Sequence, residues 1–182
     1  MGRMTASCGS AARRAVEVES YTSNMTDAVI LSACRTPIGA FGGALKDLSA
    51  SDLGAVVIRE AIARAHVSPA EIGDVLMGCV LQAGAGMNVA RQAALKAGLP
   101  VEVPAETVNR VCGSGLQAVV HAAEAVAVGY ADLYVAGGTE SMSNAPYLLK
   151  GARWDFAWEM RKRSIRCWPK ASRARLTPVT WA

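Results

Sequence analysis

The most informative segment of this chain is Val108-Asn109-Arg110-Val111-Cys112-Gly113-Ser114-Gly115-Leu116-Gln117-Ala118. Residues 104–109 before the cysteine form an extended pattern, and residues 113–128 after it form an apolar, strongly helical one. Two glycines follow the cysteine within three positions, so the backbone can turn sharply there and a ligand can approach it closely. The sequence therefore predicts a strand-to-helix junction with a thiol at the turn.

Two interpretations of Cys112 are open on this pattern alone. A cysteine at the first turn of a helix faces unpaired N–H groups and the positive end of the helix dipole, and both favour the reactive thiolate. The alternative is a small buried hydrophobic residue at the end of a strand, which is a common role for a free cysteine.

The segments around this junction alternate between strand and helix patterns. Strands are expected at 28–33, 74–81, 104–109 and 132–136, with Gly137-Gly138 ending the last one. Helices are expected from Ser49 or Ser51 to about Ala65, from Asn88 to about Ala97, and over 113–128. This alternation predicts an α/β fold with a mostly parallel sheet covered by helices on both faces, and ligands in such sheets bind beyond the carboxyl ends of the strands.

Four ordered sequence blocks resemble the thiolase family, and most closely the acetyl-CoA acetyltransferase type. The central one is Asn109-x-x-Cys112-Gly113-Ser114-Gly115-Leu116-x-Ala118, which resembles the acyl-enzyme cysteine motif. The others are Ser32-Ala33-Cys34-Arg35-Thr36-Pro37-Ile38-Gly39, Gly86-Met87-Asn88-Val89-Ala90-Arg91-Gln92-Ala93 and Val135-Ala136-Gly137-Gly138-Thr139-Glu140-Ser141-Met142-Ser143. The resemblance extends from Asp27 to about Arg153 and implies an incomplete thiolase-like half-domain.

The resemblance implies a role for Cys112 as the acyl-thioester nucleophile, with acetyl-CoA or a 3-ketoacyl-CoA as substrate rather than as a tightly bound cofactor. The enolate of a second acetyl-CoA would attack the acyl-enzyme, and thiolysis would be the reverse. Thiolases take a histidine and a second cysteine for this chemistry from their C-terminal half. His121 lies nine positions further along the helix, about half a turn out of phase with Cys112, and nothing ties His66 to the site. We therefore expect this chain to be inactive alone, and homo-oligomers in full-length members of the family.

Composition argues against several other classes of protein. The five cysteines include no Cys-x-x-Cys pair and only two histidines are present, which argues against a zinc site. An odd cysteine count without a signal peptide favours a reducing, cytoplasmic location, and no apolar run is long enough to cross a membrane. Gly84 and Gly86 lack the third glycine of a dinucleotide fingerprint, so that alternative is weak.

Both ends of the chain differ from the middle. We divide it into a leader at 1–24, expected to be disordered, a thiolase-like α/β domain at 25–153, and a basic tail at 154–182 that holds all four tryptophans. Residues 151–182 carry eight basic side chains against two acidic ones, so the positive net charge of the chain, +4, comes from this end. The tail is interpreted as an aberrant end, and binding to nucleic acid or a membrane is not expected. The alternative function is a non-catalytic remnant or interaction protein that acts through this tail.

Overall fold

The structure, a computed structural model, describes residues 27–148. Its elements run in the order α1 (Ala50–Ala65), a 3₁₀ turn η1 (Pro69–Glu71), β1 (Asp74–Gly78), α2 (Val89–Ala97), β2 (Ala105–Val108), α3 (Ser114–Ala127), β3 (Tyr134–Gly138) and a 3₁₀ turn η2 (Met142–Asn144). The interpretations of residues 1–24 and 154–182 lie outside the described residues.

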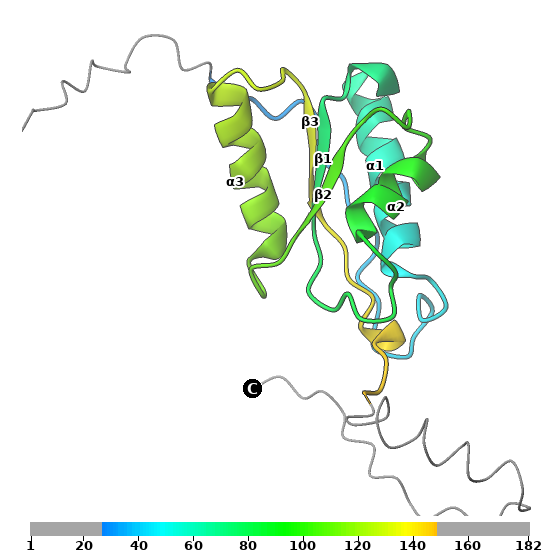
Figure 1. The fold of residues 1–182 in the computed structure, drawn as a ribbon. Helices are drawn as coiled ribbons and strands as arrows, with labels where there is room; N and C mark the ends of the chain where they lie inside the picture. The colour runs from blue at the N-terminus through cyan, green and yellow to red at the C-terminus, as the bar shows by residue number, and fades with distance from the viewer. Residues whose placement is uncertain (1–26, 149–182) are drawn as a thin grey trace, which may run out of the picture.

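The three strands form one parallel sheet in the order β2-β1-β3. The central strand places Val75 opposite Ala105 on one side and opposite Val135 on the other. Helices α1 and α2 lie on one side of this sheet and α3 on the other (Figure 1). The predicted α/β class, with helices on both faces of a parallel sheet, is confirmed. All three strands point the same way, so their carboxyl ends meet at one edge.

Helix α1 begins where the sequence predicts a cap. The Ser49 hydroxyl accepts a hydrogen bond from the Asp52 N–H, and the Asp52 carboxylate accepts one from the Ser49 N–H at 3.1 Å, which together form a capping box. The helix ends at Ala65, and His66 follows it in the left-handed conformation with a φ of 55°. Gly54 lets α2 pack closely, since a Cβ there would lie 3.0 Å from the Cβ of Ala93.

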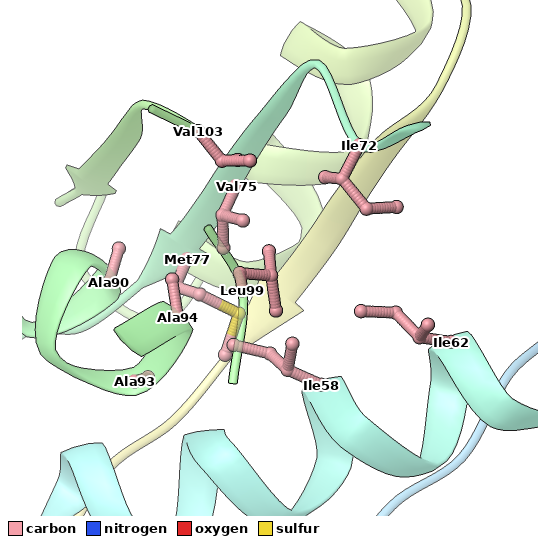
Figure 2. Close-up of a cluster of buried hydrophobic side chains, with 10 residues drawn as sticks. All are labelled: Ile58, Ile62, Ile72, Val75, Met77, Ala90, Ala93, Ala94, Leu99 and Val103. Atoms are coloured by element: carbon pink, nitrogen blue, oxygen red, sulfur yellow. The ribbon is translucent and has the colours of Figure 1, made fainter. Parts of the chain in front are cut away.

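The larger part of the core lies between the sheet and the helix pair α1–α2. Figure 2 shows the inward side chains of these elements in the space between the sheet and the helices, among them Met77, which is 1% exposed. The buried cluster consists of Ile58, Ile62, Ile72, Val75, Met77, Ala90, Ala93, Ala94, Leu99 and Val103. Burial of these apolar side chains is the main stabilising contribution, at roughly 25 cal/mol per Å² removed from water.

Helix α3 covers the opposite face with small residues. Ala118 and Ala122 pack on Leu76 and Val108, so the helix axis comes close to the sheet. The outer side of α3 leaves Leu116, 72% exposed, in contact with solvent. Within residues 27–148, no helix combines the length and the apolar character required to cross a bilayer.

The first expected strand, residues 28–33, is not a strand. Val29 and Ile30 are 75% and 80% exposed, and the segment pairs with no other strand among the described residues. It runs along α1 instead, where the Ser32 hydroxyl donates to the Ala61 carbonyl at 2.7 Å. Among the described residues β1 is paired on both sides, and the segment adds to neither the outer edge of β2 nor that of β3. The apolar run alone could not reveal this.

The glycine pair expected to end the last strand belongs to it. Met77 pairs with Gly137 and Gly78 with Gly138, and the Thr139 N–H donates to the Gly78 carbonyl at 2.9 Å. Strand β3 therefore begins and ends two residues later than predicted, while β1 ends at Gly78 rather than at residue 81. Glycines stand at the paired ends of β1 and β3 for a steric reason, because the backbone of α3 packs directly against Gly78 and Gly138.

Candidate functional site

Cys112 lies between the end of β2 and the start of α3. Strand β2 ends at Val108, Gly113 is the N-cap of α3, and Ser114 is its first residue. No side chain caps this helix start, and the Cys112 thiol is exposed. The structure therefore places the cysteine at the predicted junction, at the carboxyl edge of the sheet and ahead of the positive end of a 14-residue helix.

Three glycines bring this helix start against the sheet. A Cβ on Gly78 would lie 2.4 Å from the Gly115 backbone nitrogen, and one on Gly138 would lie 3.1 Å from the Gly115 Cα. Real Cβ atoms do not tolerate the first distance, so the backbones of β1 and α3 touch directly. This contact fixes where α3 begins and therefore where Cys112 lies.

A cavity of about 430 Å³ opens beside Cys112. Its walls come from the ends of β1 and β3 and from the β2–α3 junction. The lining residues are Gly78, Cys79, Val80, Leu81, Val111, Cys112, Ser114, Gly115, Gly138, Thr139, Glu140 and Met142. Most of this lining is apolar or backbone, and Glu140 is its only carboxylate. None of the described lining residues is a histidine.

Glu140 ties the loop after β3 to the loop after β1. Its carboxylate accepts hydrogen bonds from the Val80 N–H at 2.8 Å and from the Leu81 N–H at 3.2 Å. Hydrogen bonds to an ionised acceptor are roughly twice as strong as neutral ones. The carboxylate therefore holds one wall of the cavity in place.

Cys79 lies beneath this wall and is 1% exposed. Its Sγ donates to Glu140 at 3.6 Å. Burial, followed by the charge of Glu140, raises the pKa of the Cys79 thiol to about 12. Cys79 therefore stays protonated at neutral pH and cannot act as a nucleophile there, although it lines the same cavity as Cys112.

The residue before Cys112 has an unusual backbone conformation. Val111 is β-branched, yet it lies in the left-handed region with a φ of 51°. Its N–H donates to the Asn109 side-chain oxygen at 3.1 Å, and its carbonyl accepts from the Ser114 hydroxyl at 2.5 Å. Asn109 also donates to the Val80 carbonyl at 3.2 Å. Local side-chain bonds therefore hold a conformation that would otherwise cost about 1–3 kcal/mol.

The other reactive side chains lie apart from this cavity. Cys34 is half-buried against α1, and its thiol donates to the Val57 carbonyl at 3.2 Å. His66 caps the C-terminus of α1 and is exposed. His121 belongs to α3, and neither histidine lines the cavity around Cys112. Within residues 27–148, no three potential metal ligands cluster together.

The motif block at residues 86–93 has a structural role. Asn88 caps α2 from the left-handed region, with a φ of 51°, and its side-chain oxygen accepts the Arg91 N–H at 3.0 Å. The Arg91 guanidinium donates to the carbonyls of Val101 and Val103, and Gln92 donates to that of Ala85 at 2.9 Å. These contacts give Arg91 and Gln92 a structural role, since they hold the segments on either side of α2.

Sequence reasoning missed two residues of this site. Glu140 and Cys79 had no predicted role, although Glu140 belongs to one of the motif blocks. A carboxylate directly after a strand-ending Gly-Gly-Thr was the available signal. Its partners are backbone N–H groups about 60 positions earlier in the chain, and no sequence pattern reveals such partners.

The fold and this site together define an α/β half-domain with an exposed thiol at a strand-to-helix turn, and comparison with known proteins assigns it to a family. A family model described as "Thiolase, N-terminal domain" matches residues 28–170. The chain belongs to the thiolase family.

Similar proteins with curated names support this family assignment. The chain is 53% identical over 139 residues to an acetyl-CoA acetyltransferase of Syntrophomonas wolfei, covering 76% of this chain and 35% of the relative. It is 58% identical over 132 residues to an acetyl-CoA acetyltransferase of Cupriavidus necator, covering 72% and 34%. The chain therefore spans only about a third of the length of these relatives.

Solved structures of thiolases share the fold. The Acat5 thiolase of Ascaris suum, in complex with coenzyme A, superposes with a TM-score of 0.67 at 45% identity, covering 68% of this chain and 32% of that one. The acetyl-CoA acetyltransferase of Bacillus anthracis gives a TM-score of 0.70 at 42% identity, covering 75% and 37%. The resemblance stated from the sequence motifs is thereby confirmed.

Proposed function

We propose that this chain carries the nucleophile of a thiolase acyl-transfer site and that Cys112 takes an acyl group from a coenzyme A thioester. The observation that carries the proposal is the exposed thiol of Cys112 at the start of α3, beside a cavity where the strand ends meet. Of the three described cysteines, Cys79 is buried and Cys34 lies outside the cavity. Cys112 is therefore the thiol that a thioester in this cavity can reach.

The proposed reaction begins with attack of the Cys112 thiolate on the thioester carbonyl carbon. The bond between that carbon and the coenzyme A sulfur breaks, and coenzyme A leaves as a thiol with the proton that Cys112 gave up. The backbone N–H of Cys112 stabilises the negative oxygen that forms in between. The enolate of a second acetyl-CoA, formed when a base removes an α-proton, then attacks the acyl carbon, the bond from that carbon to the Cys112 sulfur breaks, and a 3-ketoacyl-CoA leaves. Thiolysis is the reverse: the Cys112 thiolate attacks the 3-keto carbon, the bond between C2 and C3 breaks, acetyl-CoA leaves with a proton gained at C2, and coenzyme A then takes the acyl group from Cys112.

The Cys112 thiol lies just ahead of the N-terminus of α3, where no side chain caps the helix. A positioned acid or base typically contributes 10²–10⁴-fold, and the described lining of the cavity contains no histidine for that role. We therefore expect this chain alone to be acylated slowly and not to turn over.

The remaining assignments follow from the family. We propose acetyl-CoA or a 3-ketoacyl-CoA as substrates, used in lipid metabolism and not held as tightly bound cofactors. The coenzyme A complex of the Ascaris suum thiolase supports this choice of substrate class. We further propose a cytoplasmic location and homo-oligomers of the full-length form, as the family resemblance implies.

The test is acetylation of the purified 182-residue chain by acetyl-CoA, followed by peptide mass spectrometry. We expect one acetyl group on Cys112, none in a Cys112→Ala variant, and an unchanged yield in a Cys34→Ala variant. The acetyl group should be released by hydroxylamine, as thioesters are. Acetylation of Cys34 with Cys112 unmodified would refute the proposal.

A further inference from the structure

Three loops leave the carboxyl edge of the sheet, and hydrogen bonds join them in sequence. The Glu140 carboxylate, in the loop after β3, holds the N–H groups of Val80 and Leu81 in the loop after β1. The Val80 peptide is engaged on its other side as well, because its carbonyl accepts from Asn109 at 3.2 Å. Asn109 is the first residue after β2. One carboxylate is thus linked to all three strand ends.

The connection continues to the residue next to Cys112. The side-chain oxygen of Asn109 accepts the N–H of Val111 at 3.1 Å, so the same amide group that holds Val80 also holds Val111. Ser114 completes the arrangement, since its hydroxyl accepts the Arg110 N–H at 2.9 Å and donates to the Val111 carbonyl at 2.5 Å. Val111 is therefore fixed at both ends of its backbone in the left-handed conformation.

We propose that Glu140 is a positioning residue for Cys112. Acting through Val80 and Asn109, its carboxylate keeps Val111 in the left-handed conformation and so holds the Cys112 thiol at the mouth of the cavity. This inference rests on the proposed role of Cys112 in acyl transfer. It adds a residue that lines the cavity but takes no part in the bond changes of the reaction described above.

The hydrogen bonds favour positioning over proton transfer for Glu140. Both of its oxygens already accept backbone N–H groups, and Oε1 accepts the Cys79 thiol as well. A carboxylate suits this role because it accepts on both oxygens. A glutamine in its place would turn one accepting oxygen into an NH₂ group that faces an N–H donor. The charge of Glu140 also contributes to the high pKa of Cys79, which keeps that thiol protonated as a donor.

The experiment compares two readouts in the full chain for Glu140→Ala, Glu140→Gln and Asn109→Ala, with Glu124→Ala on exposed α3 as the matched control. The first is the rate of Cys112 acetylation by acetyl-CoA, measured beside its alkylation by iodoacetamide. A small displacement costs an oriented reaction on the order of tenfold or more. We expect about a tenfold loss of acetylation in Glu140→Ala and Asn109→Ala and a smaller loss in Glu140→Gln. Alkylation, which requires no orientation, should change less than about twofold.

The second readout is hydrogen exchange at the Val80, Leu81 and Val111 amides, which does not depend on acyl transfer. We expect about tenfold faster exchange at all three in Glu140→Ala, because breaking the first link frees the others. Faster exchange at Val80 and Leu81 alone, with Val111 unchanged, would overturn the proposal. A wild-type acetylation rate in Glu140→Gln would overturn it too. If Cys79 becomes open to alkylation in Glu140→Ala, that variant is unfolded, and the result for Glu140→Gln then decides. If the wild-type chain is not acetylated at Cys112, the function proposed above fails, while exchange at Val111 still decides the role of Glu140.

Discussion

Gly78 and Gly115 meet backbone to backbone where α3 begins, and a Cβ on Gly78 would lie 2.4 Å from the Gly115 nitrogen. The contact joins the last residue of β1 to the second residue of α3. Cys112 lies three positions before Gly115, so the position of the thiol depends on how closely helix and strand approach. The glycine content of this edge is therefore a requirement of the site.

Replacement of Gly78 by alanine should be strongly destabilising. The obstructing atoms belong to backbone and cannot rotate away, so we expect a loss near the upper end of the overpacking range, about 3 kcal/mol. Urea unfolding followed by circular dichroism measures it. Gly137→Ala is the matched control, because a Cβ there would meet only the Met77 sulfur at 3.8 Å, and we expect its effect to be within about 1 kcal/mol. Equal effects of the two substitutions would contradict the steric explanation.

The three described thiols should react in a fixed order. Cys112 is exposed, Cys34 is half-buried and donates to Val57, and Cys79 is buried with its pKa raised to about 12. Iodoacetamide at mildly alkaline pH should therefore label Cys112 first and Cys34 more slowly, and should reach Cys79 only in urea. Site-resolved mass spectrometry over time gives the three rates. Preferential labelling of Cys34 would remove the basis for assigning Cys112 as the nucleophile.

Asp52 should contribute stability that is lost in acid. The hydrogen bond from Lys96 at 2.6 Å, and then that from Ser49, lower the pKa of Asp52 from 3.8 to about 2. Its contribution is therefore complete above about pH 4 and disappears as the pH falls toward 2. Because the side chain is 43% exposed, solvent screening limits the ion pair, and we expect about 1 kcal/mol, mostly from the helix cap.

Urea unfolding of Asp52→Asn between pH 2 and pH 7 is the measurement for this contribution. The difference in free energy of unfolding from wild type should narrow as the pH approaches 2. Asp132→Asn, at an exposed position after α3, serves as the control and should differ little from wild type. A difference that stays constant over the whole range would show that the lowered pKa does not stabilise the fold.

Asn88 affects the stability of the fold in two ways, and two substitutions can separate them. Its side chain bonds the Arg91 N–H, the Thr107 hydroxyl and the Ala105 carbonyl, and its backbone has a φ of 51°. Asn88→Gly loses the side-chain bonds only, whereas Asn88→Ala also places a Cβ in the left-handed region. We expect alanine to cost about 1 kcal/mol more than glycine in thermal or urea unfolding. Equal costs would indicate that the backbone conformation relaxes.

Much of this site was predictable because its chemistry is local. Glycines directly after a cysteine, an apolar helical pattern and a preceding extended segment lie within one short stretch, and short-range sterics determine what such a stretch forms. The Ser49 cap, the Pro69–Glu71 turn and the Asn88–Gly98 limits of α2 were predictable for the same reason. Each depends on bonds between residues only a few positions apart.

The sequence by itself determined the strand–helix alternation, the sites of the caps and the place of Cys112 at a helix start, since these follow from side chains acting on their own backbone. Only the tertiary structure decided that residues 28–33 lie along α1, that Gly137 and Gly138 continue a strand, and that Glu140 holds the loop after β1. Each of these outcomes depends on a partner tens of positions away. Backbone pairing and close packing assign such partners by competition among all segments at once, and no single stretch of sequence contains that information.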